Sequence, residues 1–80
     1  MNIEQMRTLH QARPFRPFDI HLADGRSVPV EHSELLAISP PGRTIAVAVP
    51  DGTIEIIDLL LVTSLKPRAN GSPRRGRTQR

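Results

Sequence analysis

Apolar residues recur at helical spacing in the first part of the chain. Ile3, Met6, Leu9 and Ala12 fall on one stripe of a helix. Asn2 is a good N-cap, and Pro14 disfavours helical geometry at the residue before it. The pattern predicts a helix over residues 2–13. A helix of about three turns is too short to be stable alone, so its apolar stripe is expected to pack on the rest of the chain.

From residue 18 onward apolar and polar residues alternate, which indicates strands. Phe18 and Ile20 precede the turn signal "ADG", and Val28 and Val30 follow it. A two-residue turn at "DG" would place these two apolar pairs on opposite faces. A three-residue loop with Gly25 in the left-handed conformation places them on one face. We therefore expect a bulged turn that pairs Ile20 with Val28 and Phe18 with Val30.

The same criteria predict further strands in the second half of the chain. They cover residues 36–39, 44–49 and 54–57, and a last short strand covers 62–65. "PPGR" and "PDGT" supply turns between them. Asp58 can start a short helical turn before the last strand.

This order of elements predicts a mainly β domain with one N-terminal α-helix. Strands of a bent meander of this length close most economically into a small SH3-like or Sm-like β-barrel of about five strands. The domain is expected to span residues 1–66. Residues 67–80 are rich in Gly, Ser, Pro and Arg without periodicity, so a disordered C-terminal tail is expected there.

The segment "IIDLLLV" departs from simple alternation because it is apolar on both sides. Either the N-terminal helix or a second subunit has to cover its second side, since a contiguous exposed apolar surface is unusual on a monomer. Leu59, Leu60 and Leu61 are therefore candidate self-association residues, and a homo-oligomer or another protein partner is expected.

Charge divides the chain into an acidic body and a basic tail. The net charge is +3, yet residues 1–65 carry five basic and eight acidic residues. The tail arginines are candidate contacts for a polyanion such as RNA, and they are Arg68, Arg74, Arg75, Arg77 and Arg80. Without a stacking aromatic among them, binding to nucleic acid is expected to be weak, sequence-blind and steeply salt-dependent.

The residue types needed for catalysis or metal binding do not converge in this sequence. Cysteine is absent, and the histidines at positions 10, 21 and 32 are far apart in the chain. Glu31 and His32 are adjacent strand residues that point to opposite faces, so they cannot easily share a metal ion. Ser33 beside His32 is a poor nucleophile–base pair for the same kind of geometric reason. We expect no enzyme activity, no metal, no cofactor and no small-molecule substrate.

Hydropathy gives no sign of a membrane protein. The chain has no apolar run near the ~18 residues that a membrane span requires, and no secretory signal follows its first residue. The expected location is the cytoplasm.

Three motifs resemble a group of short uncharacterised bacterial proteins. They are "LHQARPFRPFDIHLADGR" at residues 9–26, "AISPPGRT" at 37–44 and "PDGTIEIIDLLLVTSL" at 50–65. They cover nearly the whole body of the chain. The resemblance implies a family but no activity, because we know of none assigned to that group.

A more distant resemblance is to the Sm-like proteins, including the Hfq-type RNA chaperones. The order of an N-terminal helix, a strand ending in "LADGR", a hairpin and a short terminal strand is similar. That family forms rings and binds RNA through loop residues at the pore. Its second motif often reads Tyr-Lys-His, whereas this chain has "EIIDLLLV" there. The resemblance therefore implies the architecture and not the RNA-binding residues.

Two hypotheses of function follow from the sequence. The first is a non-catalytic protein-interaction module that associates with itself. The alternative is an RNA-binding protein that uses its arginine-rich tail.

Overall fold

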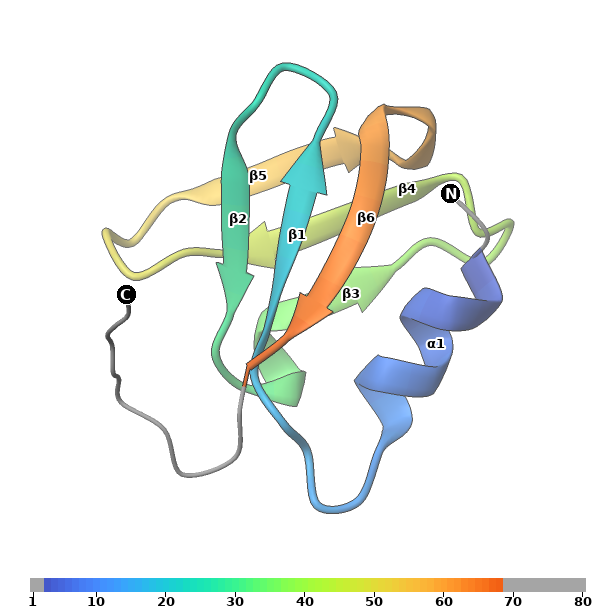
Figure 1. The fold of residues 1–80 in the computed structure, drawn as a ribbon, viewed down its shortest axis with the longest axis vertical. Coiled ribbons are helices and arrows are strands. Elements are labelled where there is room, and N and C mark those ends of the chain that lie inside the picture. The colour runs from blue at the N-terminus through green and yellow to red at the C-terminus, as the bar shows by residue number, and fades with distance from the viewer. Residues whose placement is uncertain (1–2, 69–80) are drawn as a thin grey trace.

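The computed structural model describes residues 3–68 and contains one α-helix, six strands and two short 3₁₀ turns (Figure 1). In chain order the elements are α1 (Ile3–Gln11), β1 (Phe18–Leu22), β2 (Ser27–Val30), η1 (Ser33–Leu35), β3 (Leu36–Ile38), β4 (Thr44–Ala48), β5 (Ile54–Asp58), η2 (Leu59–Leu61) and β6 (Val62–Pro67). The fold is thus mainly β with one N-terminal helix, as the sequence predicts.

The strands form two antiparallel sheets that pack face to face. The first sheet has the order β2-β1-β6 and the second has the order β3-β4-β5. The strands of the two sheets cross in Figure 1, so the sheets are packed in the orthogonal manner. Their inner faces bury a core that includes Phe18, Ile20, Val30, Ile45 and Val47.

Turn chemistry fixes the register of the first hairpin. Phe18 pairs with Val30 and Ile20 with Val28, which confirms the predicted pairing. Gly25 has φ +94° and its N–H donates to the carbonyl oxygen of Leu22 at 3.0 Å, so the three-residue bulged loop is confirmed as well. The alternation of apolar and polar residues was sufficient to predict this register. A register shifted by one residue would have placed the apolar residues of one strand on the outer face.

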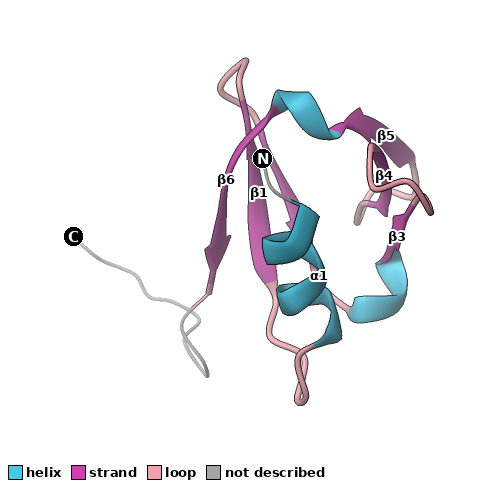
Figure 2. Ribbon diagram, turned by 90° about the vertical axis from the view of Figure 1, so that its right-hand side faces the viewer, coloured by secondary structure: helices cyan, strands magenta, loops and turns pink. Residues whose placement is uncertain are grey.

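Helix α1 joins the two sheets at one open side of the sandwich, as Figure 2 shows. Met6 is fully buried in the core, and Ile3 and Leu9 pack against it from the same stripe. Nε2 of His10 lies 2.8 Å from the carbonyl oxygen of Ser33, which ties the helix to η1. The predicted packing of the helical stripe on the rest of the chain is therefore confirmed, although α1 ends at Gln11 and not at residue 13.

The structure has six strands, at the six places where the sequence predicts them, and β6 is longer than predicted, with six residues that pair with β1. The ordered domain also extends beyond residue 66, since Pro67 ends β6 and the N–H of Arg68 donates to the carbonyl oxygen of Pro17 at 3.0 Å. Within residues 3–68 no strand ladder joins the two sheets, so closure into a barrel stays a prediction. The rest of the expected tail lies outside the described residues.

Gly42 in the turn between β3 and β4 is expected to tolerate a side chain less well than Gly25. Both have positive φ, which costs a non-glycine residue about 1–2 kcal/mol. A Cβ at Gly42 would also lie 3.2 Å from Cγ1 of Ile3, whereas one at Gly25 would meet nothing within 4 Å. We expect Gly42→Ala to lower the free energy of unfolding by about 1 kcal/mol more than Gly25→Ala. Urea denaturation measures both, and equal losses would show that Ile3 moves aside freely.

Candidate protein-interaction surface

Four large hydrophobic side chains are exposed on β5 and η2. Ile54 and Ile56 are 66% and 70% exposed, and Leu60 and Leu61 are 85% and 53% exposed. Ile57 between them is buried, because neighbouring strand residues point to opposite faces of the sheet. We call the four exposed residues together the β5–η2 surface.

The turn η2 decides which of its three leucines are exposed. The side chain of Asp58 accepts a hydrogen bond of 2.9 Å from the N–H of Leu60, and this cap starts the 3₁₀ turn. With about three residues per turn, only one side chain of three faces the core. That residue is Leu59, which is 6% exposed. Leu59 is therefore a core residue and not a self-association residue, whereas Leu60 and Leu61 remain candidates.

The outer face of the second sheet extends the apolar surface. Ala46 pairs with Ile56, and Ala48 pairs with Ile54, so these side chains lie on one face. Ala37 on β3 pairs with Ala46 and continues the same face. Strand β5 is also one of the two edge strands of this sheet.

The isoleucines of this surface were not predicted as association residues, although the sequence carries a signal for them. On β4 the apolar residues Ile45 and Val47 alternate with alanines and so share one face, and they pair with Ile57 and Glu55. In strand β5 Ile54 and Ile56 alternate with these partners. The same alternation would therefore have assigned Ile54 and Ile56 to the outer face of the sheet. The N-terminal helix does not cover the second side of "IIDLLLV". It packs on the core through Met6 and leaves Ile56, Leu60 and Leu61 exposed.

A hollow of about 320 Å³ adjoins the β5–η2 surface. Its wall is formed by Ile56 and Leu61 on one side and by the β1–β2 turn on the other. Arg26 in this turn lies 3.0 Å from Asp24 and 3.6 Å from Glu55, so it connects the turn to β5. The N–H of Arg26 donates to the Asp24 carboxylate and lowers the pKa of that carboxyl. The hollow thus has an apolar wall and a charged rim.

At the opposite end of the first sheet, Arg68 is held by two carboxylates. Its guanidinium lies 3.0 Å from Glu31 and 3.0 Å from Asp19, and these contacts raise the pKa of Arg68 above its usual value. From the sequence Arg68 is a candidate polyanion contact in the tail, but its guanidinium already has two carboxylate partners within the domain. The other candidate polyanion contacts lie outside the described residues, and they are Arg74, Arg75, Arg77 and Arg80.

The three histidines lie on different elements of the fold. His10 is on α1, His21 on β1 and His32 in the connection from β2 to η1. Over residues 3–68, no group of three or more histidine and carboxylate side chains is arranged to hold a metal ion. Within the same range, no helix has the length and apolar character needed to cross a membrane.

No protein-family model matches the chain, and neither the curated proteins nor the solved structures include a significant match to it. The geometry of the described residues is therefore the basis for assigning a function.

Proposed function

We propose that this protein is a non-catalytic interaction module that self-associates through the β5–η2 surface. The observation that carries the proposal is the exposure of Ile54, Ile56, Leu60 and Leu61 on one strand and the turn that follows it. Monomeric proteins rarely expose contiguous apolar patches of this kind, and larger ones mark interaction sites. A second copy of the chain is the simplest partner that offers a matching apolar surface.

The shape of the surface supports the proposal. Ala37, Ala46 and Ala48 leave a shallow face beside the two isoleucines, onto which another sheet face can pack closely. Leu60 protrudes most, and the hollow beside Ile56 and Leu61 offers a recess for a protruding side chain. A buried apolar anchor in a recess with a polar rim is the usual arrangement of an interface centre.

The finer architecture belongs to the same proposal. Two crossed three-stranded sheets with one helix at the open side are compatible with an SH3-like or Sm-like barrel. An unpaired strand edge, such as that of β5, can pair with another chain. Over residues 3–68 most carboxylates cap turns or pair with arginines, which favours a binding role over catalysis. The proposed location is the cytoplasm.

Leu60→Glu is expected to dissociate the oligomer without unfolding the subunit. A charge at the most exposed position of the surface cannot be buried without a partner, so association should weaken by about 30-fold or more. Sedimentation velocity over a range of concentrations measures the association, and circular dichroism checks the fold. Gln11→Glu is the matched control, because it adds the same charge at an exposed position at the end of α1.

The result against this proposal is specific. If the wild-type chain sediments as a monomer at high micromolar concentration, self-association is wrong. If Leu60→Glu and Gln11→Glu weaken association equally, the oligomer forms through another surface.

A further inference from the structure

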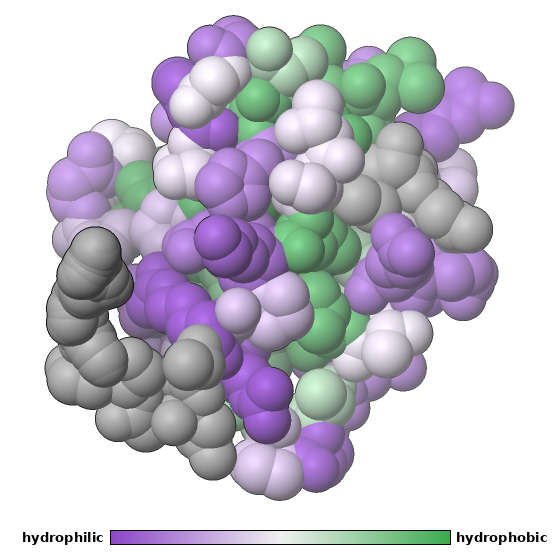
Figure 3. All heavy atoms as spheres, in the orientation of Figure 1, coloured by the Kyte–Doolittle hydropathy of each residue, from purple (hydrophilic) through white to green (hydrophobic). Residues whose placement is uncertain are grey.

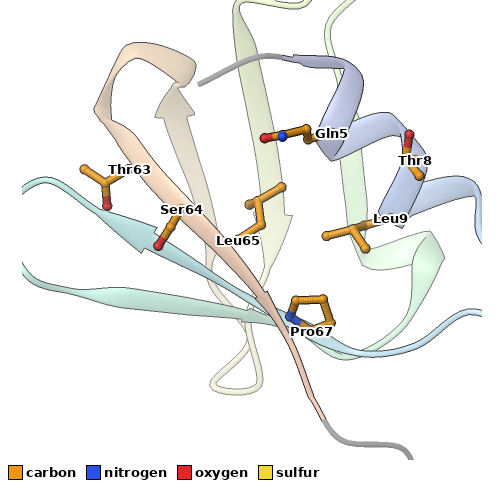
Figure 4. A pocket seen from close by; sticks show the side chains of 7 residues that line it. All are labelled: Gln5, Thr8, Leu9, Thr63, Ser64, Leu65 and Pro67. Atoms are coloured by element: carbon orange, nitrogen blue, oxygen red, sulfur yellow. The ribbon is translucent and has the colours of Figure 1, made fainter.

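A groove of about 480 Å³ runs between α1 and β6, on a different part of the molecule from the β5–η2 surface. Figure 4 shows Leu9 of α1 and Leu65 of β6 facing each other across it, with Gln5 pointing from the helix toward the strand. Hydrophobic atoms are visible in the same gap in Figure 3, between purple polar side chains. The groove therefore has an apolar floor and polar sides.

One side of this groove is the unpaired edge of a β-sheet. Strand β6 is the last strand in the order β2-β1-β6, so its second edge has no strand partner. The N–H of Arg68 bonds to Pro17, and bonded pairs alternate along an antiparallel ladder. The backbone of Lys66 therefore faces Asp19 of β1, and the N–H and C=O of Leu65 point away from β1. Among residues 3–68, no backbone hydrogen bond joins α1 to Leu65.

The end of the groove near Pro67 is basic. It continues into a second depression of about 320 Å³ that shares Leu9 and Pro67 with it. Arg13 and Arg16 line this second part and are exposed. Neither guanidinium forms an ion pair with any residue of the described range 3–68. An occupant that carries a carboxylate at this end would complement them.

We infer that this groove binds an extended peptide as an added strand on β6, with an acidic residue of the peptide at Arg13 and Arg16. The backbone of the peptide bonds to Leu65, and an alternate apolar side chain rests on Leu9 and Leu65. A polyanion such as RNA also suits the two arginines. It is the poorer match, because phosphates make no use of a strand edge or of an apolar floor. The inference does not depend on the self-association proposed above, since the two surfaces share no residue.

The test uses the full chain and two fluorescein-labelled octapeptides with blocked ends. One reads Asp-Asp-Ser-Val-Ser-Leu-Ser-Val and the other is its reverse, so that both strand directions are covered. A third peptide has Lys-Lys in place of Asp-Asp, and a fourth is N-methylated at alternate residues and cannot add to a strand edge. Fluorescence anisotropy gives the affinity, and amide chemical shifts and hydrogen exchange locate the site.

We expect one of the two acidic peptides to bind and to protect the amide of Leu65 from exchange. Arg16→Glu should weaken it about tenfold, because a charge-assisted contact is replaced by repulsion. Arg43→Glu is the matched control at an exposed arginine outside the groove and should leave binding unchanged. The lysine and N-methylated peptides should bind at least about tenfold more weakly than the acidic one.

Several results overturn the inference. One is that neither acidic peptide changes the amide shift or exchange of Leu65 up to about 1 mM. Another is that the acidic and lysine peptides, or the acidic and N-methylated peptides, bind with equal affinity. A third is that Arg16→Glu and Arg43→Glu have equal effects on binding. Tight binding of oligouridylate that depends on Arg16 would assign the groove to nucleic acid instead. Leu60→Glu should leave peptide binding intact, which separates this result from that of the self-association test.

Discussion

Replacing Phe18 by alanine is expected to unfold most of the protein at 25 °C. Phe18 is fully buried on the central strand β1, where it pairs with Val30 on one side and Pro67 on the other. Truncating such a side chain costs about 3–5 kcal/mol. A single hydrophobic core in a domain of fewer than about 70–80 residues rarely supplies more than about 3–5 kcal/mol, which is as large as this loss. Circular dichroism and urea denaturation measure the loss.

Phe15 supplies the matched control for this substitution. Its ring lies 6.0 Å from that of Phe18, but it is only partly buried at the edge of the core. We expect Phe15→Ala to cost less than half as much, because less apolar area is lost. Equal costs for the two substitutions would mean that the connector before β1 is as much a part of the core as the strand itself.

Met6→Ala is expected to detach α1 from the sheets. Met6 is the one residue of α1 that is fully buried, and removing a buried methionine side chain costs about 2–5 kcal/mol. A helix of nine residues cannot persist without this packing. Native-state hydrogen exchange should show the amides of α1 exchanging much faster, while those of β1 and β4 keep part of their protection.

Leu9→Ala is the control on the same helical stripe. Leu9 is only partly buried, so a smaller loss is expected. If Met6→Ala speeds exchange equally in α1, β1 and β4, the helix and the sheets form one cooperative unit. The expectation of local detachment would then be wrong, although the loss of stability would remain.

Much of the local structure could be predicted because its signals are local. The parity of apolar residues around "ADG" gave the register of the first hairpin, and Asp58 gave the short turn η2. The pairing of β6 with β1 could not be predicted in this way, because Thr63 and His21 are 42 positions apart and no turn relates them. Closure of the sheets into a barrel depends on the same kind of distant contact.

The candidate surface was predicted only in part for a related reason. Three adjacent leucines look alike in the sequence, and only the rotation within η2 separates buried Leu59 from exposed Leu60 and Leu61. The run of tail arginines likewise hid the distinct role of Arg68. Its partners Asp19 and Glu31 lie far away in the sequence and meet it only when β6 joins the sheet.

The pairing of β1 with β6 also sets the order in which a growing chain can fold. During synthesis the three hairpins, β1–β2, β3–β4 and β4–β5, can close as soon as they leave the ribosome, because their loops are short. Strand β1 has to wait for β6, and until residue 67 emerges one of its edges stays open. Another copy that has already released its own β6 can fill that edge. Co-translational exchange of β6 between neighbouring nascent chains is therefore a route by which two subunits can become interlocked.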